Sequence, residues 1–411
     1  MCADQLNIAL IIPNVDVFSG GVERTLKLVE HAGTARIRYT AFVPAGGSPN
    51  AEVVARLKEL ELAGRVEVRQ LAPGRLSNGG SRFDAVAVPT EYWWGAWKRA
   101  KAAGLRAPCC VDVHQLPYIG TLDILKTINI DEPTLPDVGR MPFLQHKLYV
   151  DGLLDAAFQT VASVASVRWF SSVRDGMLMA VTPVVAKNLA ALGYRGPTFV
   201  PACPNGIDRG AIEAQRLTDD PAEFDAVFAG RFHPQKGFLD VPQIVAHLRR
   251  FLGREPKVAV CGGSGLPRHV AQFRAAARRL GIERSLEILG RVPKAELYRT
   301  IRQAKVLLYP SYVDGFSITV LEALCLGVPV AAYDIDAMRM IWSHRKAVYS
   351  APVGNPRALA VLVSTLVRGG EFEDARKAAR IQSTALMDEY TWEKVVADER
   401  RFYEHAIVAA A

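Results

Sequence analysis

The chain has 411 residues, 50% of them hydrophobic, which is enough for two domains with sizeable cores and excludes a disordered protein. Its net charge of +8 favours anionic partners such as nucleotides, phospholipid surfaces or nucleic acid. Six cysteines form no C-x-x-C pair and several lie in apolar runs, which indicates reduced thiols in a cytosolic compartment. We expect no signal peptide and no transmembrane helix, because no apolar run is long enough.

In the N-terminal half, short apolar runs alternate with segments of helical period, which is the pattern of parallel βαβ units. We expect strands at 7–13, 39–45 and 83–89, and a helix at 22–32 that follows a turn at Gly20-Gly21. A further buried strand begins at 109 and is expected to end at His114.

The alternation starts again in the C-terminal half. The expected strands there are 224–231, 257–263, 285–292, 304–311 and 328–334, with a helix from about 238. The sequence therefore predicts an α/β protein of two Rossmann-like halves joined near residue 205, with a ligand bound between them at the carboxyl ends of the strands. The segment 115–154 breaks the pattern and is predicted to be a lid, a substrate loop or partly disordered.

The stretch "SYVDGFSITVLEALCLG" (311–327) changes character halfway. We expect a turn at "VDGF" in which Gly315 adopts a positive φ, followed by a helix that ends at Gly327. The amides of Ser317, Ile318 and Thr319 would then lie at the helix N-terminus without partners in the helix. Together with Gly315 and Phe316 they would form a phosphate cradle.

Two carboxylates flank this cradle, Asp314 before it and Glu322 in the first turn of the helix. Carboxylates accept hydrogen bonds from sugar hydroxyls, so the pattern suits a sugar nucleotide, with one acid on the transferred sugar and the other on the ribose. Two simpler interpretations stay open. Glu322 can close a capping box with Thr319, and Asp314 can be an ordinary turn residue.

Together with other motifs, this stretch resembles the retaining GT-B glycosyltransferases of family 4 (glycosyl transferases group 1). "DGFSITVLE" matches the family's signature of two acids, with Asp314 where the family usually has Glu. The same resemblance covers "GGVERTLKLVEHA" (20–32), "NGID" (205–208), "AGRFHPQKG" (229–237), "CGGSG" (261–265), "LGRVP" (289–293) and "YTWEKVVADERRFYEHA" (390–406).

The resemblance implies roles for further residues. Gly20 and Gly21 would let backbone approach the donor, Arg231 and Lys236 would hold its diphosphate, and the backbone of Arg291 and Val292 would read the nucleobase. Each also has a simpler interpretation, as an ordinary turn, a solvated cation or a strand end.

At the end of the strand from 109, His114 is the main candidate for a catalytic role near the sugar hydroxyls, with Asp112 on the same face of the strand as the alternative. We predict a metal-independent hexosyltransferase without a cofactor, whose substrate is a GDP- or UDP-linked sugar, and the resemblance implies retention of configuration. The sequence leaves open the base, the sugar, the acceptor, the linkage and the oligomeric state.

The predicted domains are an acceptor-binding domain over 1–203, a nucleotide-sugar-binding domain over 204–388, and a C-terminal helix over 389–411 that packs back on the first domain. The segment 91–108 mixes interfacial aromatics and cations, which suits an anionic membrane surface and a lipid-linked or glycolipid acceptor, although a helix with a buried aromatic face fits as well. Its relevant residues are Trp93, Trp94, Trp97, Lys98, Arg99 and Lys101. We therefore expect a cytoplasmic protein, peripheral on the membrane.

Two rival functions remain compatible with the sequence. One is a sugar-nucleotide epimerase of the same fold, which needs no acceptor. The other is a non-catalytic sugar-nucleotide-binding subunit, for which Asp314 in place of Glu is the hint. A nucleic-acid-binding role is disfavoured because no basic stripe with interleaved aromatics is present.

Overall fold

The computed structural model describes residues 5–12, 20–44, 50–71, 83–89, 100–105, 107–114, 167–168, 170–171, 175–216, 222–263 and 267–411. These residues form two compact units. The first contains the described residues up to His114, those from Val167 to Ile207 and those from Tyr390 onward, and the second runs from Asp208 to Glu389. The chain leaves the first unit between Ile207 and Asp208 and returns to it between Glu389 and Tyr390.

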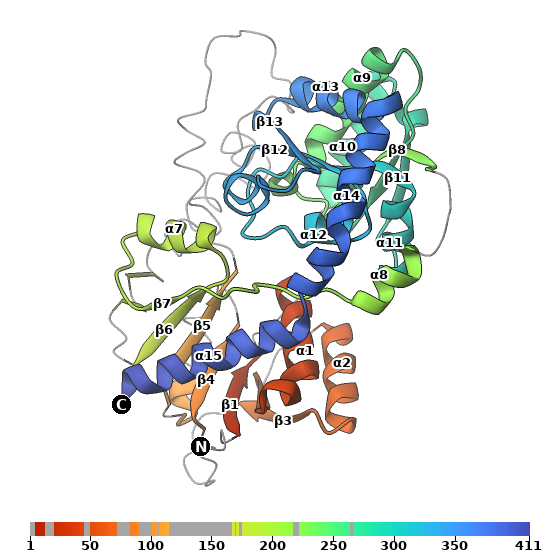
Figure 1. Cartoon of the computed structure of the whole chain (residues 1–411). Helices are drawn as coiled ribbons and strands as arrows, with labels where there is room; N and C mark the ends of the chain where they lie inside the picture. The colour runs from red at the N-terminus through yellow and green to blue at the C-terminus, as the bar shows by residue number, and fades with distance from the viewer. Residues whose placement is uncertain are drawn as a thin grey trace. The chain divides into compact units, whose positions relative to one another are not determined.

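The first unit is built on a seven-stranded parallel sheet in the order β3-β2-β1-β4-β5-β6-β7 (Figure 1). The strands are β1 (Leu6–Ile11), β2 (Ile37–Pro44), β3 (Val66–Leu71), β4 (Ala85–Val88), β5 (Cys109–Val113), β6 (Gly176–Ala180) and β7 (Thr198–Phe199). Its helices among the described residues are α1 (Gly20–His31), the 3-10 turn η1 (Ala32–Ala35), α2 (Ala51–Leu62), α7 (Pro183–Ala191) and α15 (Trp392–Ala410).

The apolar runs of this unit become buried strands because both faces of a parallel sheet are covered. All five residues of β5 are buried, as are the last four of β1. Helix α15 packs against α1 and against β4, β5 and β6, and it contributes Phe402 and Tyr403 to the core of the unit. The C-terminal segment of the chain is thus part of the first unit's core (Figure 1).

The second unit has a six-stranded parallel sheet in the order β10-β9-β8-β11-β12-β13. The strands are β8 (Phe224–Ala229), β9 (Val258–Cys261), β10 (Leu286–Gly290), β11 (Ala304–Tyr309), β12 (Val330–Tyr333) and β13 (Val348–Ala351). The helices are α8 (Arg209–Arg216), η3 (Pro234–Lys236), η4 (Phe238–Asp240), α9 (Val241–Leu252), α10 (Pro267–Leu280), η5 (Glu283–Ser285), α11 (Lys294–Arg302), α12 (Ile318–Cys325), η6 (Met338–Trp342), α13 (Pro356–Leu366) and α14 (Gly369–Glu389).

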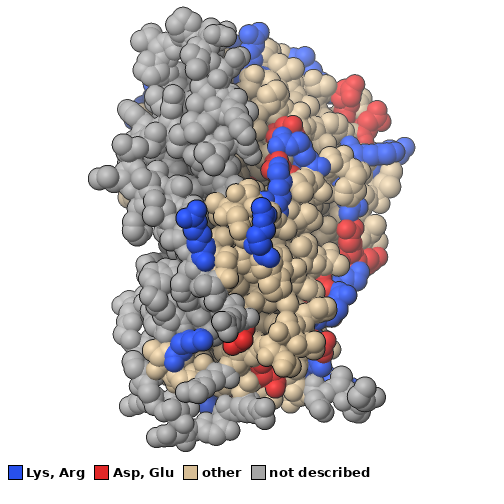
Figure 2. Space-filling view, turned by 90° about the vertical axis from the view of Figure 1, so that its left-hand side faces the viewer, with Lys and Arg blue, Asp and Glu red and all other residues tan. Residues whose placement is uncertain are grey.

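Both units therefore have the predicted Rossmann-like architecture of a parallel sheet between helices. An aromatic stack holds the start of the second unit together, since Phe238 lies 4.4 Å from both Phe232 and Phe273, measured between ring centroids. Among the described residues, no helix combines the length and hydropathy needed to cross a membrane. On the described part of the face in Figure 2, Lys and Arg are interspersed with Asp and Glu, so no continuous basic patch forms there.

Candidate functional site

The candidate site lies at the carboxyl edge of the second unit's sheet. The strand order reverses beside β8, because β9 and β10 follow on one side of it and β11, β12 and β13 on the other. In open α/β sheets, ligands bind at such a switch point, outside the carboxyl ends of the strands. The two loops that begin there are 230–237, after β8, and 310–317, after β11. They contain five of the twelve residues predicted to bind the donor, together with Asp314.

These two loops are fixed to each other by backbone contacts. Gly237 has φ +68°, and a Cβ at this position would lie 1.9 Å from the carbonyl oxygen of Pro310, so only glycine fits. The amide of Tyr312 donates to the carbonyl of Gln235 at 3.0 Å. The loop after β8 therefore has a defined position against the loop after β11.

The contact brings together Lys236 and Asp314. The Lys236 Nζ lies 2.5 Å from Asp314 Oδ2, and their side chains keep 17% and 15% of their exposure. The Tyr309 hydroxyl donates to the same oxygen, and the Gly315 amide donates to Asp314 Oδ1 at 2.8 Å. Burial opposes ionisation, but the charge and hydrogen bond of Lys236 prevail and lower the pKa of Asp314. The site thus holds an ionised carboxylate paired with an ammonium.

Helix α12 begins beside this pair, but the turn before it differs from the prediction. Ser317, not Gly315, adopts the left-handed conformation, with φ 75° and ψ 67°, and its side chain does not cap the helix. The indole Nε1 of Trp342 donates to the carbonyl of Phe316 at 2.8 Å and so fixes the backbone before Ser317. The expectation for Gly315 was wrong because this tertiary contact fixes the backbone so that the left-handed residue lies two positions later, at Ser317.

The amides of Ile318 and Thr319 occupy the first positions of α12, where a helix has no acceptors of its own for its N–H groups. The Val320 and Leu321 amides already donate to the Ser317 carbonyl, at 3.0 and 3.2 Å. The predicted cradle is thus confined to the first residues of an eight-residue helix.

Glu322 lies in the second turn of α12, not in the first as predicted, because the helix starts at Ile318. Its Oε1 accepts from the Tyr298 hydroxyl at 3.0 Å and lies 2.6 Å from Lys294 Nζ. Glu322 is 5% exposed. The helix begins after Ser317, so the capping box between Thr319 and Glu322 is not the arrangement present. Instead, Glu322 is held by two residues of α11.

The neighbouring strand ends complete the edge. Gly262 has φ +143°, and a Cβ there would lie 1.7 Å from the Gly230 carbonyl oxygen, while a Cβ on Gly263 would lie 3.2 Å from the Cβ of Arg291. The "CGG" motif therefore allows β8, β9 and β10 to end close together. Arg231 is exposed, with a long 3.5 Å contact from Nη2 to Gln235 Oε1. Arg291 is exposed too, and Val292, next to it, is partly buried.

In the first unit, His114 directly follows β5, as predicted, and is partly buried. Its Nε2 is buried and has no hydrogen-bond partner among the described residues. Burial and the charge of Arg24 lower the pKa of His114 to about 3, so the imidazole is neutral at physiological pH. Asp112 is 2% exposed and forms an ion pair with Arg24 at 3.2 Å, which leaves His114 as the candidate at the strand end.

Gly20 and Gly21 are the first two residues of α1, so the predicted glycine turn is the start of a helix. Of the proposed membrane or acceptor residues, Lys101 is described and exposed. The others, Trp93, Trp94, Trp97, Lys98 and Arg99, lie outside the described residues, as does the segment 115–154.

Several residues of the site were not predicted from the sequence. Lys294 and Tyr298 sit one helical turn apart on α11 and contact Glu322, and Tyr309 is the last residue of β11. Their one sequence signal is position, since Tyr309 ends β11, and Lys294 and Tyr298 lie four and eight residues after the end of β10 at Gly290. Arg24, four residues into α1, had no signal beyond its place after the glycine pair.

Comparisons with known proteins show what the chain is similar to. Residues 212–382, within the second unit, match the model of the family described as glycosyl transferases group 1. The resemblance to GT-B glycosyltransferases found in the sequence is thereby confirmed, together with the fold described above.

Particular relatives fall in the same class. The chain is 25% identical over 252 residues to D-inositol 3-phosphate glycosyltransferase of Jonesia denitrificans, which covers 58% of this chain and 59% of the relative. It is 28% identical over 210 residues to the protein of the same name from Corynebacterium glutamicum, covering 49% of this chain and 48% of the relative. The chain thus spans about half the length of the curated relatives it matches.

Solved structures extend the likeness to the whole chain. HepE of Anabaena in complex with UDP-glucose has a TM-score of 0.67 at 15% identity, covering 98% of this chain and 99% of that one. Sucrose-phosphate synthase from Thermosynechococcus elongatus has a TM-score of 0.67 at 15% identity, covering 98% of this chain and all 100% of the other. At such identities the likeness concerns the fold.

Proposed function

We propose that the chain is a retaining hexosyltransferase that moves a sugar from a nucleoside-diphosphate sugar to a hydroxyl acceptor without a catalytic metal. The observation that carries the proposal is the Lys236–Asp314 pair at the switch point of the second sheet, beside the N-terminus of α12. It lies inside the segment that matches glycosyl transferases group 1.

In this reaction the bond between the anomeric carbon and the β-phosphate oxygen breaks, and a bond to the acceptor oxygen forms on the same face. The acceptor proton passes to the departing phosphate. Negative charge develops on that phosphate, and fixed donors stabilise it best. Lys236, Arg231 and the amides of Ile318 and Thr319 are the groups proposed for it, while Asp314 accepts from sugar hydroxyls.

The donor is proposed to be GDP- or UDP-linked. Its base would meet the strand end at Arg291 and Val292, and its ribose would meet Glu322, close to Lys294. HepE, which has this fold, binds UDP-glucose, and this favours UDP as the first nucleotide to test. Melting temperatures measured with UDP, GDP, ADP and their sugars test the proposal, because a ligand that binds only the folded protein stabilises it.

Product formation separates this function from its two rivals. An epimerase converts the nucleotide sugar without an acceptor, and a binding subunit leaves it intact. We expect the released nucleoside diphosphate to depend on added acceptor, measured by coupled assay and by mass spectrometry of the product. Conversion of the donor sugar without acceptor would favour the epimerase, and binding without any turnover would favour the subunit.

Two acceptor classes are proposed. The first is a lipid-linked saccharide or glycolipid taken by a peripheral protein from an anionic membrane surface, as the sequence of 91–108 suggests. Salt-sensitive sedimentation with anionic liposomes, weakened by joint charge reversal at Lys98, Arg99 and Lys101, is the expected result. Failure to sediment even at low salt would exclude it.

The second class is a soluble polyol phosphate. It is favoured by the names of the relatives, which are D-inositol 3-phosphate glycosyltransferases. Parallel assays with inositol phosphate and with a glycolipid in vesicles discriminate the two classes, because the same donor and the same release assay serve both.

A further inference from the structure

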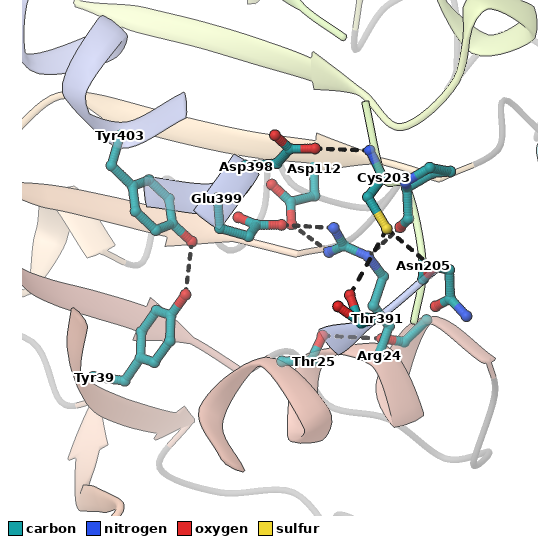
Figure 3. A network of polar contacts seen from close by, with 12 residues as sticks. Arg24, Thr25, Tyr39, Asp112, Cys203, Asn205, Thr391, Asp398, Glu399 and Tyr403 are labelled. Atoms are coloured by element: carbon teal, nitrogen blue, oxygen red, sulfur yellow. Dashed lines mark hydrogen bonds and ion pairs between the residues drawn. The ribbon is translucent and has the colours of Figure 1, made fainter. Parts of the chain in front are cut away.

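A buried arginine in the first unit joins three segments that are far apart in the sequence. Arg24 of α1 is 3% exposed. Its Nη1 donates to Asp112 Oδ2 of β5 at 3.2 Å, its Nη2 to Glu399 Oε1 of α15 at 2.7 Å, and its Nε to the carbonyl of Pro204 at 2.9 Å. Figure 3 shows the guanidinium pointing toward both carboxylates. One side chain thus sets the positions of a helix, a strand and the segment that leads out of the unit.

Stability alone is a poor reason for this arrangement. Two carboxylates face one guanidinium, and each keeps one buried oxygen, Asp112 Oδ1 and Glu399 Oε2, without a hydrogen-bond partner among the described residues. Buried ion pairs seldom stabilise a protein more than apolar residues of the same shape, and unsatisfied buried oxygens cost free energy. Burial and the charge of Glu399 raise the pKa of Asp112, so this arrangement disfavours two ionised carboxylates side by side.

The network instead leads to the candidate site residues of this unit. Asp112 precedes His114 by two positions, and side chains two apart point to the same face of a strand. Arg24 lies about one helical turn after Gly20 and Gly21, where α1 begins. Arg24 also acts on His114 directly, because its charge adds to burial in lowering the pKa of that imidazole.

We propose that Arg24 is a positioning residue for the transfer reaction, which holds the end of β5, next to His114, against the start of α1. This inference rests on the proposed function, since it gives Arg24 a role in that reaction. A neutral His114 can accept a hydrogen bond from a sugar hydroxyl or donate one to it. It does so without placing a cation beside the anomeric carbon, which itself becomes positively charged in the transition state.

Among the described residues, the titratable groups of the Arg24 network come from four elements. Arg24 comes from α1, Cys110 and Asp112 from β5, Tyr39 from β2, and Glu399 and Tyr403 from α15. The two tyrosine hydroxyls lie 3.2 Å apart, and burial raises the pKa of both, so they remain neutral. Removal of Arg24 therefore leaves two carboxyl groups in this network and takes away the one cation that, among the described residues, is known to act on the imidazole.

The test compares Arg24→Met and Arg24→Lys with Arg376→Met. Arg376 is a matched control, because it is 5% exposed and donates to the carbonyls of Ala304 and Arg302 in the second unit. For Arg24→Met we expect kcat to fall at least about tenfold with the Kd of the nucleoside diphosphate unchanged. Arg24→Lys keeps the positive charge but not the planar guanidinium with its several donors. This variant should fold and keep a low pKa at His114, and its kcat should fall less than that of Arg24→Met.

A second measurement does not depend on turnover. Titration of labelled imidazoles by NMR, with the His114 signal identified among the eight histidines from a His114→Asn variant, gives its pKa directly. We expect the pKa to rise by roughly 1–3 units in Arg24→Met and to stay low in Arg376→Met.

The outcomes separate the two proposals. If the wild-type protein neither binds nor turns over any nucleotide sugar, the proposed function fails, and the imidazole titration still decides the role of Arg24. If the His114 pKa is unchanged in Arg24→Met, or if Arg24→Met and Arg24→Lys lose melting temperature but keep wild-type kcat as Arg376→Met does, the inference is overturned. Should Arg24→Met fail to fold, Arg24→Lys with wild-type kcat would overturn it equally.

Discussion

Removal of the Lys236 charge is the most informative perturbation of the candidate site. In Lys236→Met, Asp314 keeps the Tyr309 hydroxyl and the Gly315 amide but loses the ammonium at 2.5 Å. Breaking a fully buried ion pair costs about 3–5 kcal/mol. Because the two side chains keep 17% and 15% of their exposure, we expect a smaller loss of unfolding free energy, about 2 kcal/mol at pH 7.

The same change should weaken nucleotide binding. If Lys236 donates a charged hydrogen bond to the diphosphate, its loss costs roughly 1.5–3 kcal/mol, which is about a 10- to 150-fold increase in Kd. Titration calorimetry with UDP and GDP measures this. The control is Lys257→Met. Lys257 directly precedes β9, at the opposite edge of the same sheet, and its Nζ lies 2.5 Å from Glu223 Oε1.

The pH dependence checks the cause of the stability loss. The pKa of Asp314 is lowered in the folded protein, so the pair's contribution is present above the usual carboxyl pKa of 3.8 and disappears as the pH falls below it. The difference in unfolding free energy between wild type and Lys236→Met should therefore shrink from pH 7 to pH 3. Asp314→Asn in the Lys236→Met background should recover most of the loss. Unchanged affinity in a folded Lys236→Met protein would refute the assignment to the diphosphate.

Three further predictions concern single side chains. Glu322→Gln should weaken binding of the nucleoside diphosphate about tenfold by calorimetry if Glu322 holds the ribose, whereas Asp314→Asn should spare that binding and reduce transfer; an effect of Glu322→Gln on melting temperature alone would contradict this. Ser317→Gly removes the left-handed strain at φ 75° and should raise the unfolding free energy in denaturant by up to about 1 kcal/mol, and a clear loss would speak against strain at this turn. The lowered pKa of His114, about 3, means that the folded state disfavours the imidazolium, so wild type should lose about 3 kcal/mol more stability than His114→Asn between pH 6.5 and pH 4, measured by denaturant titration. Parallel curves for the two proteins would contradict the neutral imidazole.

Most strands could be predicted from the sequence, including the outermost strand β10, but β3, β6, β7 and β13 were missed. Strands β8, β9 and β11 are mostly apolar, with at most one charged residue each, because helices cover both sides of a parallel sheet. The missed strands β3 and β13 are the outermost strands of their sheets and mix buried with exposed residues, so no continuous apolar run marks them. The two-residue β7, also outermost, is too short to have a pattern.

For the candidate site, the sequence indicated which loops contain the site residues but not which side chains pair with one another. Lys236 and Asp314 were each predicted to contact the donor, yet their pairing spans 78 positions and depends on the fit of Gly237 against Pro310. The bond from Arg24 to Glu399 spans 375 positions, and no local pattern reports such a contact. The left-handed residue was misassigned for the same reason, since a distant indole fixes the turn.

The pairing of the two acids resolves a difficulty in using carboxylates near a diphosphate. A bare carboxylate repels phosphate oxygens, and this repulsion is strong in a partly buried site. Here each acid has a lysine within 2.6 Å, Asp314 with Lys236 and Glu322 with Lys294. Each ion pair is close to neutral, so the net attraction for the phosphates comes from Arg231 and from the first amides of α12, while Lys236 can still donate a hydrogen bond to the diphosphate. In the proposed reaction, the acids can therefore bind sugar and ribose hydroxyls without driving the diphosphate away, because their charges are balanced before the donor arrives.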